Sequence, residues 1–233
     1  MKRHTFALVA LAALSLAPHL VSAQAETEKS RTVAGGGVLV KGWMGKVDAK
    51  EATAGMTIEN AKLASEGKDI RVTTGPASVF WSASNTASGD YTVTATFNEP
   101  AYMSLNSHPH PYGVVIGGND MGTDTQSYLY CAAYGNGNFI VRGFGPAAFQ
   151  MNGRGAADPA VNKAEAVGKP VTQVIALSVK GDKVECAING KTVASYAKAD
   201  VVGAGKLKST DGVYGIRFAH NTEAIVSGLK LTK

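Results

Sequence analysis

The chain has 233 residues, of which 45% are hydrophobic, 18% are charged and 7% are aromatic, with 27 glycines. The hydrophobic share excludes wholesale disorder, and the length suits one ordinary domain or at most two small ones. The formal net charge of +5 makes the chain look basic, but part of that charge lies in its first few residues.

The first 23 residues have the order of a secretory signal peptide. Lys2 and Arg3 precede an apolar stretch over residues 6–17, and small residues at 21–23 predict cleavage before Gln24. The apolar stretch is too short to span a bilayer, and no later segment approaches about 18 apolar residues. The sequence therefore predicts a periplasmic or secreted protein without a transmembrane segment, and a retained N-terminal anchor is the alternative.

Removal of residues 1–23 leaves 210 residues, with 21 Lys and Arg against 18 Asp and Glu, a net charge of +3. No dense Lys/Arg stripe remains, so the sequence predicts no nucleic-acid partner. Residues 24–37 are polar and then Gly-rich, which indicates a flexible leader. We expect residues 38–233 to form a single domain.

Apolar residues alternate with polar ones in several short segments from Val38 onward. Such alternation with one buried face is typical of strands in an antiparallel β-sandwich. No long amphipathic helix and no internal repeat is visible, so the predicted fold class is all-β. The clearest rows are Tyr91, Val93, Ala95 and Phe97; Val171, Gln173, Ile175, Leu177 and Val179; Val184, Cys186 and Ile188; and Tyr214, Ile216 and Phe218.

Turn signals separate these rows. Asn136-Gly137 predicts a hairpin with a two-residue turn, which would place Tyr134 opposite Phe139. A long loop over residues 147–169 follows, and Gly and Asn turns then predict a three-stranded meander over residues 172–197. One helical turn is expected within residues 195–202.

Cys131 and Cys186 are the only two cysteines of the chain. Export to an oxidising compartment would allow them to form a disulfide. In the chain-entropy model, a loop of this length would contribute roughly 4 kcal/mol to stability. Two buried free thiols are the alternative, since the sequence does not show whether the two residues approach each other.

The order of turns and strands near the C-terminus carries a family resemblance. The segments VTQVIALSVKGDKVECAINGKTVASY and DGVYGIRFAHNTEAIVSGLKLTK resemble the concanavalin A-like lectin and glucanase sandwiches, especially laminin-G-like and 3-keto-disaccharide hydrolase-like exported domains. The central segments are similar to those of exported bacterial proteins with this fold. The resemblance implies an antiparallel jelly roll and implies no particular activity.

The segment His108-Pro109-His110-Pro111-Tyr112 is the first candidate site. Prolines hold it extended, so the two imidazoles should point the same way. They could bind a metal with His220 as a distant third ligand, contact a bound ligand, or line the rim of the sandwich. No Asp, Glu or Cys completes a ligand set by its spacing, and we therefore expect no metal and no cofactor.

An aromatic strand is the second candidate. Tyr128, Tyr130 and Tyr134 share one face of the strand, and Cys131 lies on the other. If Cys131 meets Cys186, the tyrosines face outward, onto a surface where jelly rolls of this type bind sugars. If the cysteines do not meet, we expect these tyrosines in the core.

Polar residues near that strand form a third group. Gln126 and Arg142 are suited to holding hydroxyl or carboxylate groups, as are Asn119, Asp120 and Asp124. Arg217 should lie on the face opposite its apolar neighbours. Trp81 is expected in the core, and a stacking platform is the alternative. The predicted ligand-binding residues are His108, His110, Tyr112, Gln126, Tyr128, Tyr130, Tyr134 and Arg142.

Motifs for catalysis are missing from the sequence. Neither the Glu-x-Asp strand motif of retaining glucanases of this fold nor G-x-S-x-G nor H-E-x-x-H occurs. We therefore expect a non-catalytic module that binds a carbohydrate. One alternative is a hydrolase or lyase acting on a sugar or keto-glycoside through His108 or His110. The other is a structural or protein-interaction domain of the envelope.

Overall fold

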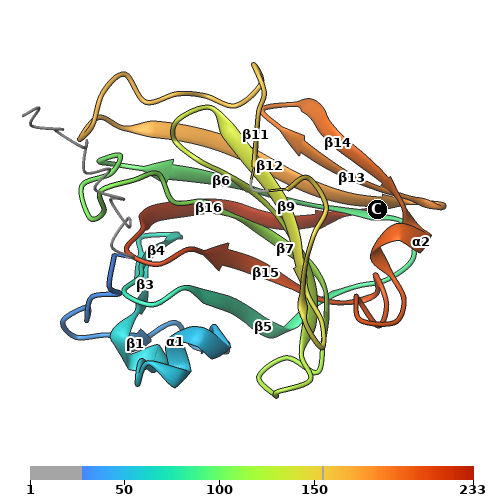
Figure 1. Cartoon of the computed structure of the whole chain (residues 1–233), viewed down its shortest axis with the longest axis horizontal. Helices are drawn as coiled ribbons and strands as arrows, with labels where there is room; N and C mark the ends of the chain where they lie inside the picture. The colour runs from blue at the N-terminus through green and yellow to red at the C-terminus, as the bar shows by residue number, and fades with distance from the viewer. Residues whose placement is uncertain (1–27, 154) are drawn as a thin grey trace, which may run out of the picture.

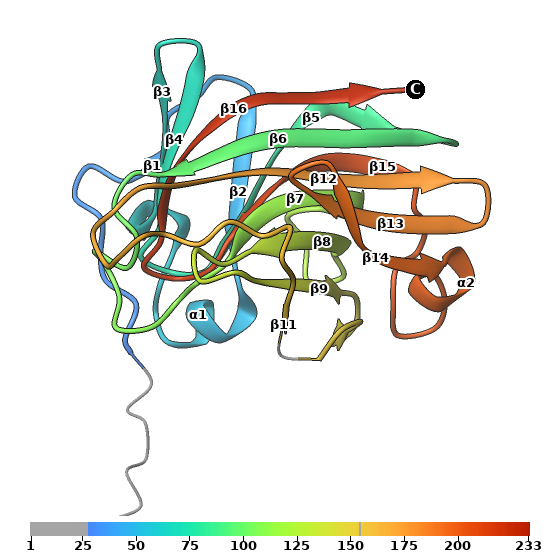
Figure 2. The same ribbon diagram turned by 90° about the horizontal axis from the view of Figure 1, so that it is seen from above.

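The computed structural model describes residues 28–153 and 155–233, and these form two stacked β-sheets (Figures 1 and 2). The strands of sheet A are, in spatial order, β1 (Gly37–Val38), β3 (Lys62–Glu66), β4 (Asp69–Thr73), β16 (Glu223–Thr232), β6 (Tyr91–Glu99), β12 (Val171–Lys180), β13 (Lys183–Ile188) and β14 (Lys191–Ala197). The strands of sheet B are β10 (Ala148–Gln150), β9 (Asn138–Phe144), β8 (Ser127–Ala133), β7 (Tyr112–Asn119), β15 (Gly212–Phe218), β5 (Ser78–Ala87) and β2 (Trp43–Val47), with β11 (Ala156–Ala157) also paired to β9.

All of these pairs are antiparallel except β1 with β3. The helical elements are short: α1 (Ala49–Thr53), the 3-10 turn η1 (Ile58–Asn60) and α2 (Lys198–Val201). The predicted all-β jelly-roll sandwich is therefore confirmed. In the described residues, no helix has the length and apolar character needed to cross a membrane.

The core lies between the two sheets, and the period-two rows supply it. Along β6, buried residues alternate strictly with half-buried ones, and the buried row runs from Tyr91 to Phe97 as predicted. Sheet B contributes Ile216 and Phe218 from β15, which belong to the same buried cluster as the residues of sheet A. The ring of Phe218 lies 6.0 Å from that of Phe97. The faces of these strands are therefore set by alternation.

The meander β12–β13–β14 matches the predicted turns. Gly181 takes a φ of 57° between β12 and β13, and Asn189 and Gly190 take φ values of 50° and 80° between β13 and β14. Both positions of the second turn have positive φ, which Asn-Gly tolerates better than other pairs. The predicted helical turn is α2, and β10 and β11 lie within the segment that the sequence predicts as a long loop.

The hairpin β8–β9 differs from its prediction by one residue. Ala133 pairs with Phe139, and the amide of Tyr134 donates to the carbonyl of Asn138 at 2.8 Å. The loop therefore contains three residues, Gly135, Asn136 and Gly137, instead of two. The amide of Gly137 donates to the carbonyl of Tyr134 at 3.3 Å, which closes the turn. Gly137 itself has a φ of 91°, so this three-residue loop ends on a residue with positive φ. The register shift moves Phe139 from the predicted outer face into the core.

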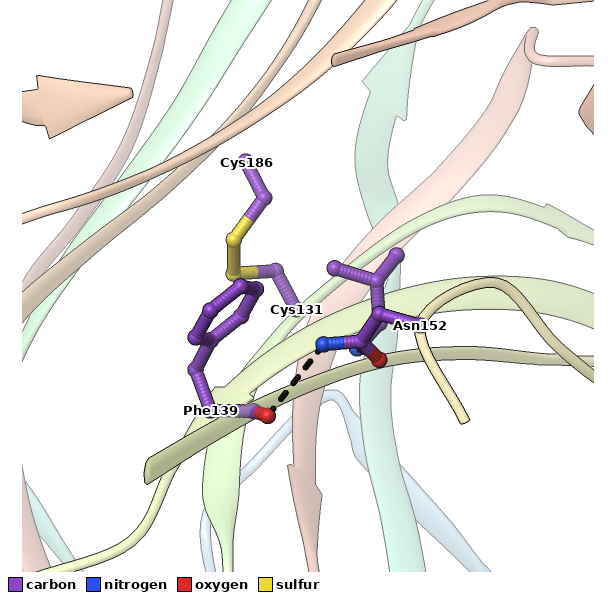
Figure 3. Close-up of a disulfide and its surroundings, with 5 residues drawn as sticks. Cys131, Phe139, Asn152 and Cys186 are labelled. Atoms are coloured by element: carbon purple, nitrogen blue, oxygen red, sulfur yellow. Dashed lines mark hydrogen bonds between the residues drawn. A yellow bond between two sulfur atoms is a disulfide. The ribbon is translucent and has the colours of Figure 1, made fainter. Parts of the chain in front are cut away.

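Cys131 in β8 and Cys186 in β13 form a disulfide that joins the two sheets, with their Cα atoms 5.9 Å apart (Figure 3). Both side chains are fully buried, and the ring of Phe139 lies against them. The disulfide alternative of the sequence analysis is therefore confirmed. It follows that Cys131 marks the core face of β8.

The predicted leader, residues 24–37, lies only partly within the described residues. The predicted signal peptide and residues 24–27 lie outside the described residues. Residues 28–37 are held on the sandwich, because the amide of Val33 donates to the carbonyl of Asn60 and Gly37 begins β1. The expectation of a flexible leader is therefore wrong for residues 28–37, whose polar character serves contacts with the rest of the chain.

One buried carboxyl lies at the end of β6. Glu99 is 5% exposed, and its Oε1 accepts a hydrogen bond from the amide of Met103 at 3.3 Å. Burial raises the pKa of Glu99 to about 7. The side chain therefore holds a proton in the folded chain at pH values where the unfolded chain releases it.

Replacement of both cysteines tests the contribution of the disulfide. We expect Cys131→Ala with Cys186→Ala to lower the free energy of unfolding by about 4 kcal/mol, since the unfolded chain gains conformational freedom. Urea unfolding of the variant and of the wild type under oxidising conditions measures this loss. A loss below about 1 kcal/mol would contradict it.

Substitution of Glu99 tests the buried carboxyl. Its stabilising proton is fully present below pH 4.5, the ordinary value, and is lost as the pH rises through 7. We expect Glu99→Gln to raise the free energy of unfolding by about 2–3 kcal/mol at pH 8.5 and to change it little at pH 4.5. Urea unfolding at both pH values, with Glu165→Gln as an exposed control, measures the difference; equal effects at the two pH values would refute it.

Candidate functional site

The tyrosines of β8 face away from the disulfide, as alternation requires, but they are not accessible. Tyr128 is fully buried and Tyr130 is 5% exposed. They belong to an outer cluster on the far face of sheet B, which consists of Val79, Trp81, Val115, Tyr128, Tyr130, Ala132 and Ile140. Trp81 is thus buried as expected, although in this second cluster and not in the core between the sheets.

Charged and aromatic side chains cover the outer cluster. The ring of Phe144 lies 5.1 Å from that of Tyr128, and the guanidinium of Arg217 lies 5.8 Å from the ring centre of Tyr130. Arg217 Nη2 forms an ion pair with Asp48 Oδ2 at 2.5 Å. These groups occupy the faces of the two tyrosine rings. Tyr128 and Tyr130 therefore do not form the open sugar-stacking surface that the sequence suggested.

Arg217 is buried, and its partner Asp48 is half-buried. Burial opposes the charge of Arg217, but the carboxylate of Asp48 and the nearby Tyr128 outweigh it and raise the pKa of Arg217. The guanidinium is therefore charged at every physiological pH and requires its partner. The pair anchors the start of α1 to sheet B, and Arg217 lies on the face predicted for it.

The other residues predicted to bind a ligand or to lie near the tyrosines do not gather into one site. Tyr112 is fully buried in the core, where its ring stacks on Phe97 at 5.5 Å, so its expected role in ligand contact is corrected. Gln126 accepts a hydrogen bond from the amide of Gly122 and braces its own loop. Tyr134 and Arg142 are half-buried. The remaining polar residues of that group bind their neighbours: Asn119 binds the carbonyls of Gly117 and Asp211, Asp120 pairs with Lys208, and Asp124 pairs with Lys46.

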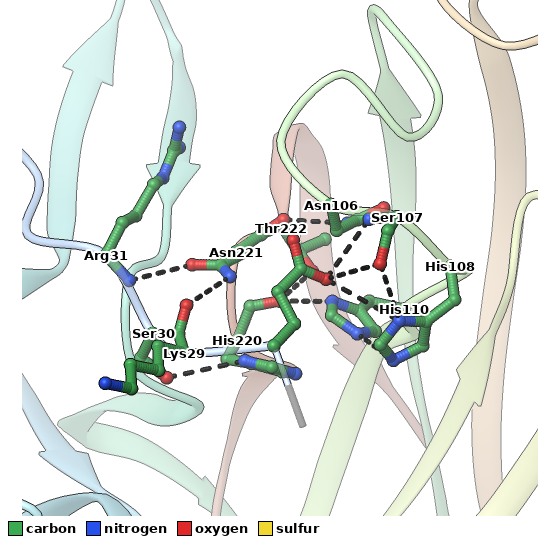
Figure 4. Close-up of polar contacts among 11 residues, drawn as sticks. Lys29, Ser30, Arg31, Asn106, Ser107, His108, His110, His220, Asn221 and Thr222 are labelled. Atoms are coloured by element: carbon green, nitrogen blue, oxygen red, sulfur yellow. Dashed lines mark hydrogen bonds and ion pairs between the residues drawn. The ribbon is translucent and has the colours of Figure 1, made fainter. Parts of the chain in front are cut away.

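The structure does bring the three histidines together. A ring nitrogen of each of His108, His110 and His220 lies within 4.8 Å of the other two. His110 Nε2 is 2.8 Å from His108 Nε2, and the rings of His110 and His220 are 4.2 Å apart at their centres. Figure 4 shows the three rings side by side, with the N-terminal segment on one side and the β6–β7 loop on the other.

The opposite nitrogen of each ring contacts another group. His110 Nδ1 donates to the carbonyl oxygen of His220 at 2.6 Å, because a carbonyl only accepts. His108 Nδ1 lies 3.5 Å from Glu28 Oε2, and His220 Nδ1 lies 3.4 Å from Ser30 Oγ. In all three histidines, Nδ1 is thus the nitrogen that contacts a group other than an imidazole ring.

Asn221 holds these segments in place. It follows His220 in the β15–β16 turn with a φ of 47°, a conformation that Asn tolerates. Its Oδ1 accepts from the amide of Arg31, its Nδ2 donates to the carbonyl of Lys29, and its own carbonyl accepts from Asn106 Nδ2. One turn residue therefore connects the N-terminal segment and the β6–β7 loop around the histidines.

A cleft of about 670 Å³ opens beside the cluster. Its walls come from the N-terminal segment, α1 and the residues after it, the β6–β7 loop and the β15–β16 turn, and seven of its nine lining residues have polar or charged side chains. The lining residues are Glu28, Lys29, Ser30, Lys50, Glu51, Ala54, Met56, His108 and His220. A cleft of this volume is in the range of small-molecule sites.

Burial determines the charge state of the inner histidines. Burial, and then the neighbouring imidazoles of His220 and His108, lower the pKa of His110 to about 4. Burial also lowers the pKa of His220. His110 is therefore a neutral imidazole at neutral pH. Because its Nδ1 carries the hydrogen, its Nε2 presents a lone pair to His108.

Sequence reasoning missed seven of the nine residues that line this cleft. Glu28, Lys29 and Ser30 fall in the segment predicted to be a leader, and Lys50 and Glu51 carry no motif. Ser30 Oγ donates to Glu51 Oε2 at 2.7 Å across 21 positions, and it lies beside His220 across 190. No local pattern reports such long-range contacts. The one available signal was the pair of histidines at alternate positions in 108–112.

Comparisons with known proteins show the fold. No protein-family model and no curated protein matches the chain. The solved structures that share the fold include the carbohydrate-binding module CBM66 from Bacillus subtilis, with a TM-score of 0.51 and 13% identity over 84% of this chain and 99% of that one. Another is a Bacillus subtilis protein of unknown function with a galectin-like fold, with a TM-score of 0.55 and 14% identity over 82% of this chain and 89% of that one.

The chain therefore shares its β-sandwich fold with a carbohydrate-binding module and with a protein of galectin-like fold, in keeping with the antiparallel jelly roll that the resemblance implied. At identities of 13% and 14%, the comparisons define the architecture and leave the activity to the chain's own residues.

Breaking the buried ion pair tests how the outer cluster is covered. We expect Asp48→Ala to lower the free energy of unfolding by about 3–5 kcal/mol, because it leaves Arg217 charged and buried without its partner. Asp124→Ala is the matched control: it breaks the Lys46 pair, in which Asp124 is fully exposed, and should cost less than about 1 kcal/mol. Urea unfolding compares the two variants, and similar losses would contradict the assignment.

Proposed function

We propose that the protein is an exported, non-catalytic module that binds a carbohydrate in the cleft beside the histidines. The observation that carries this proposal is the set of charged and polar side chains that line the cleft, at one end of a lectin-like sandwich. The shared fold with a carbohydrate-binding module supports it without assigning a ligand.

The chemistry of the lining suits a ligand rich in hydroxyl groups. The carboxylates of Glu28 and Glu51 accept hydrogen bonds, and the ammonium groups of Lys29 and Lys50 donate them. Met56 adds an apolar contact for the C–H face of a sugar ring. This mixture of donors and acceptors distinguishes the cleft from an apolar pocket and favours a saccharide, including one that carries a carboxylate.

Export is part of the proposal. The predicted signal peptide leads the chain out of the cytoplasm, and the disulfide between Cys131 and Cys186 is of the kind that persists in oxidising compartments. We infer a periplasmic or secreted location. A ligand there would be an envelope or environmental glycan.

A glycan array with the purified chain tests the proposal, followed by calorimetry on the best ligand. We expect Lys29→Met with Lys50→Met to weaken binding at least tenfold, because both side chains line the cleft. Lys183→Met, at an exposed position in β13, is the control and should bind as the wild type does. Absence of any glycan ligand, or equal binding by the two variants, would overturn the proposal.

A hydrolase or lyase is the second candidate. The observation that favours it is the presence of two carboxylates, Glu28 and Glu51, in one cleft with histidines that could accept a proton. Product release from a panel of glycosides and keto-glycosides, lost in Glu28→Gln and in Glu51→Gln, would support this candidate. Wild-type inactivity on a glycan that the protein binds would exclude it for that glycan.

A further inference from the structure

We propose that His108, His110 and His220 form a binding site for a divalent transition metal of the zinc type. The proposal does not depend on carbohydrate binding: the site is defined by the three imidazoles and the groups behind them. It goes beyond the sequence analysis, which found no complete ligand set, because the structure adds His220 and its surroundings to the histidine pair.

The first argument is distance. Two nitrogens that bind one tetrahedral zinc ion at ~2.05 Å lie roughly 3.4 Å apart. The two Nε2 atoms of His108 and His110 are 2.8 Å apart, and no ligand nitrogen of the three is more than 4.8 Å from another. The measured separation is below the required value, and the others exceed it by at most about 1.4 Å. Side-chain shifts of about 1.4 Å or less would bring all three nitrogens to it.

The second argument is the group behind each ring. Histidines that bind metals donate their other N–H to a carboxylate, a carbonyl or a similar acceptor, which fixes the tautomer and the ring direction. Here His110 Nδ1 donates to the carbonyl of His220, His108 Nδ1 faces Glu28, and His220 Nδ1 faces Ser30 Oγ. All three Nδ1 atoms are thus directed to acceptors, which leaves the three Nε2 atoms as ligands.

Ser30 and the acidic side chains complete this pattern. The hydroxyl of Ser30 donates to Glu51 Oε2 at 2.7 Å, so the same oxygen is free to accept a hydrogen bond from His220 Nδ1. Glu28 is held in turn by the amide of Ser107, which donates to its Oε2 at 3.1 Å. The two carboxylates also place negative charge near a dication without binding it directly, since His108 separates Glu28 from the metal, and Ser30 and His220 separate Glu51 from it.

The third argument is access. His108 and His220 line the cleft, and the side chain of His108 is 54% exposed. Three protein ligands with solvent on the remaining side leave a coordination position open to water or to a ligand in the cleft, which is the arrangement of reactive zinc sites. A bound ligand with a carboxylate or adjacent hydroxyls could occupy that position.

Metal content and affinity test the proposal on the untagged, exported chain. We expect calorimetry with ZnCl₂ to show one site per chain. His108→Ala, at an exposed position that folding tolerates, should weaken zinc binding at least a hundredfold. Cobalt in place of zinc should give the visible absorption of a four-coordinate site, and His108→Ala should remove it. Failure to bind zinc, or equal binding by wild type and His108→Ala, would overturn the proposal.

Variants behind the rings separate a built site from chance contact. We expect Glu28→Gln to weaken zinc binding about tenfold to a hundredfold, because it removes the carboxylate behind His108. Glu165→Gln, an exposed acid in another loop, should leave zinc affinity unchanged. Equal effects of the two acid variants would show a response to net charge alone and refute the assignment. Lys29→Met with Lys50→Met should retain zinc binding, so that loss of glycan binding and loss of metal binding are distinguishable.

Discussion

The packing of sheet A on sheet B, joined by Cys131 and Cys186, is the constraint on which the rest of the molecule depends. Once Cys131 is committed to the interface, alternation assigns every other residue of β8 to one side or the other. The neighbouring strands of sheet B follow through their registers. The outer cluster is a consequence, because the tyrosines have no place between the sheets and must be covered on the far side.

That covering changes which part of the molecule is available for binding. Tyr128 and Tyr130 have the residue type expected of a sugar platform, yet Phe144 and the guanidinium of Arg217 occupy their faces. Aromatic character and strand face are thus insufficient to define a binding surface, since a buried ring stabilises the fold instead. The polar cleft lies elsewhere, at the end of the sandwich where loops and the N-terminal segment meet.

The sequence predicts those features whose causes are local. The rows of β6, β12 and β13 and the turns of the meander follow from alternation and from Gly and Asn at the turns. The predicted length of the β8–β9 turn is one residue too short, because Gly135, Asn136 and Gly137 suit both a two-residue and a three-residue loop. The cleft required contacts that no window of sequence contains. Glu28 and Ser30 look like leader residues until Asn221 is seen to hold the segment beside them.

The connection between Ser30 and His220 spans 190 positions and therefore affects the order of assembly. Contacts of such separation carry a large loop-closure cost and form late, after the nearer strands have paired. During synthesis, residues 28–31 leave the ribosome long before the β15–β16 turn exists. The sandwich has to be nearly complete before residues 28–31 can take their position. The contacts around the histidine cluster are therefore among the last to form during folding.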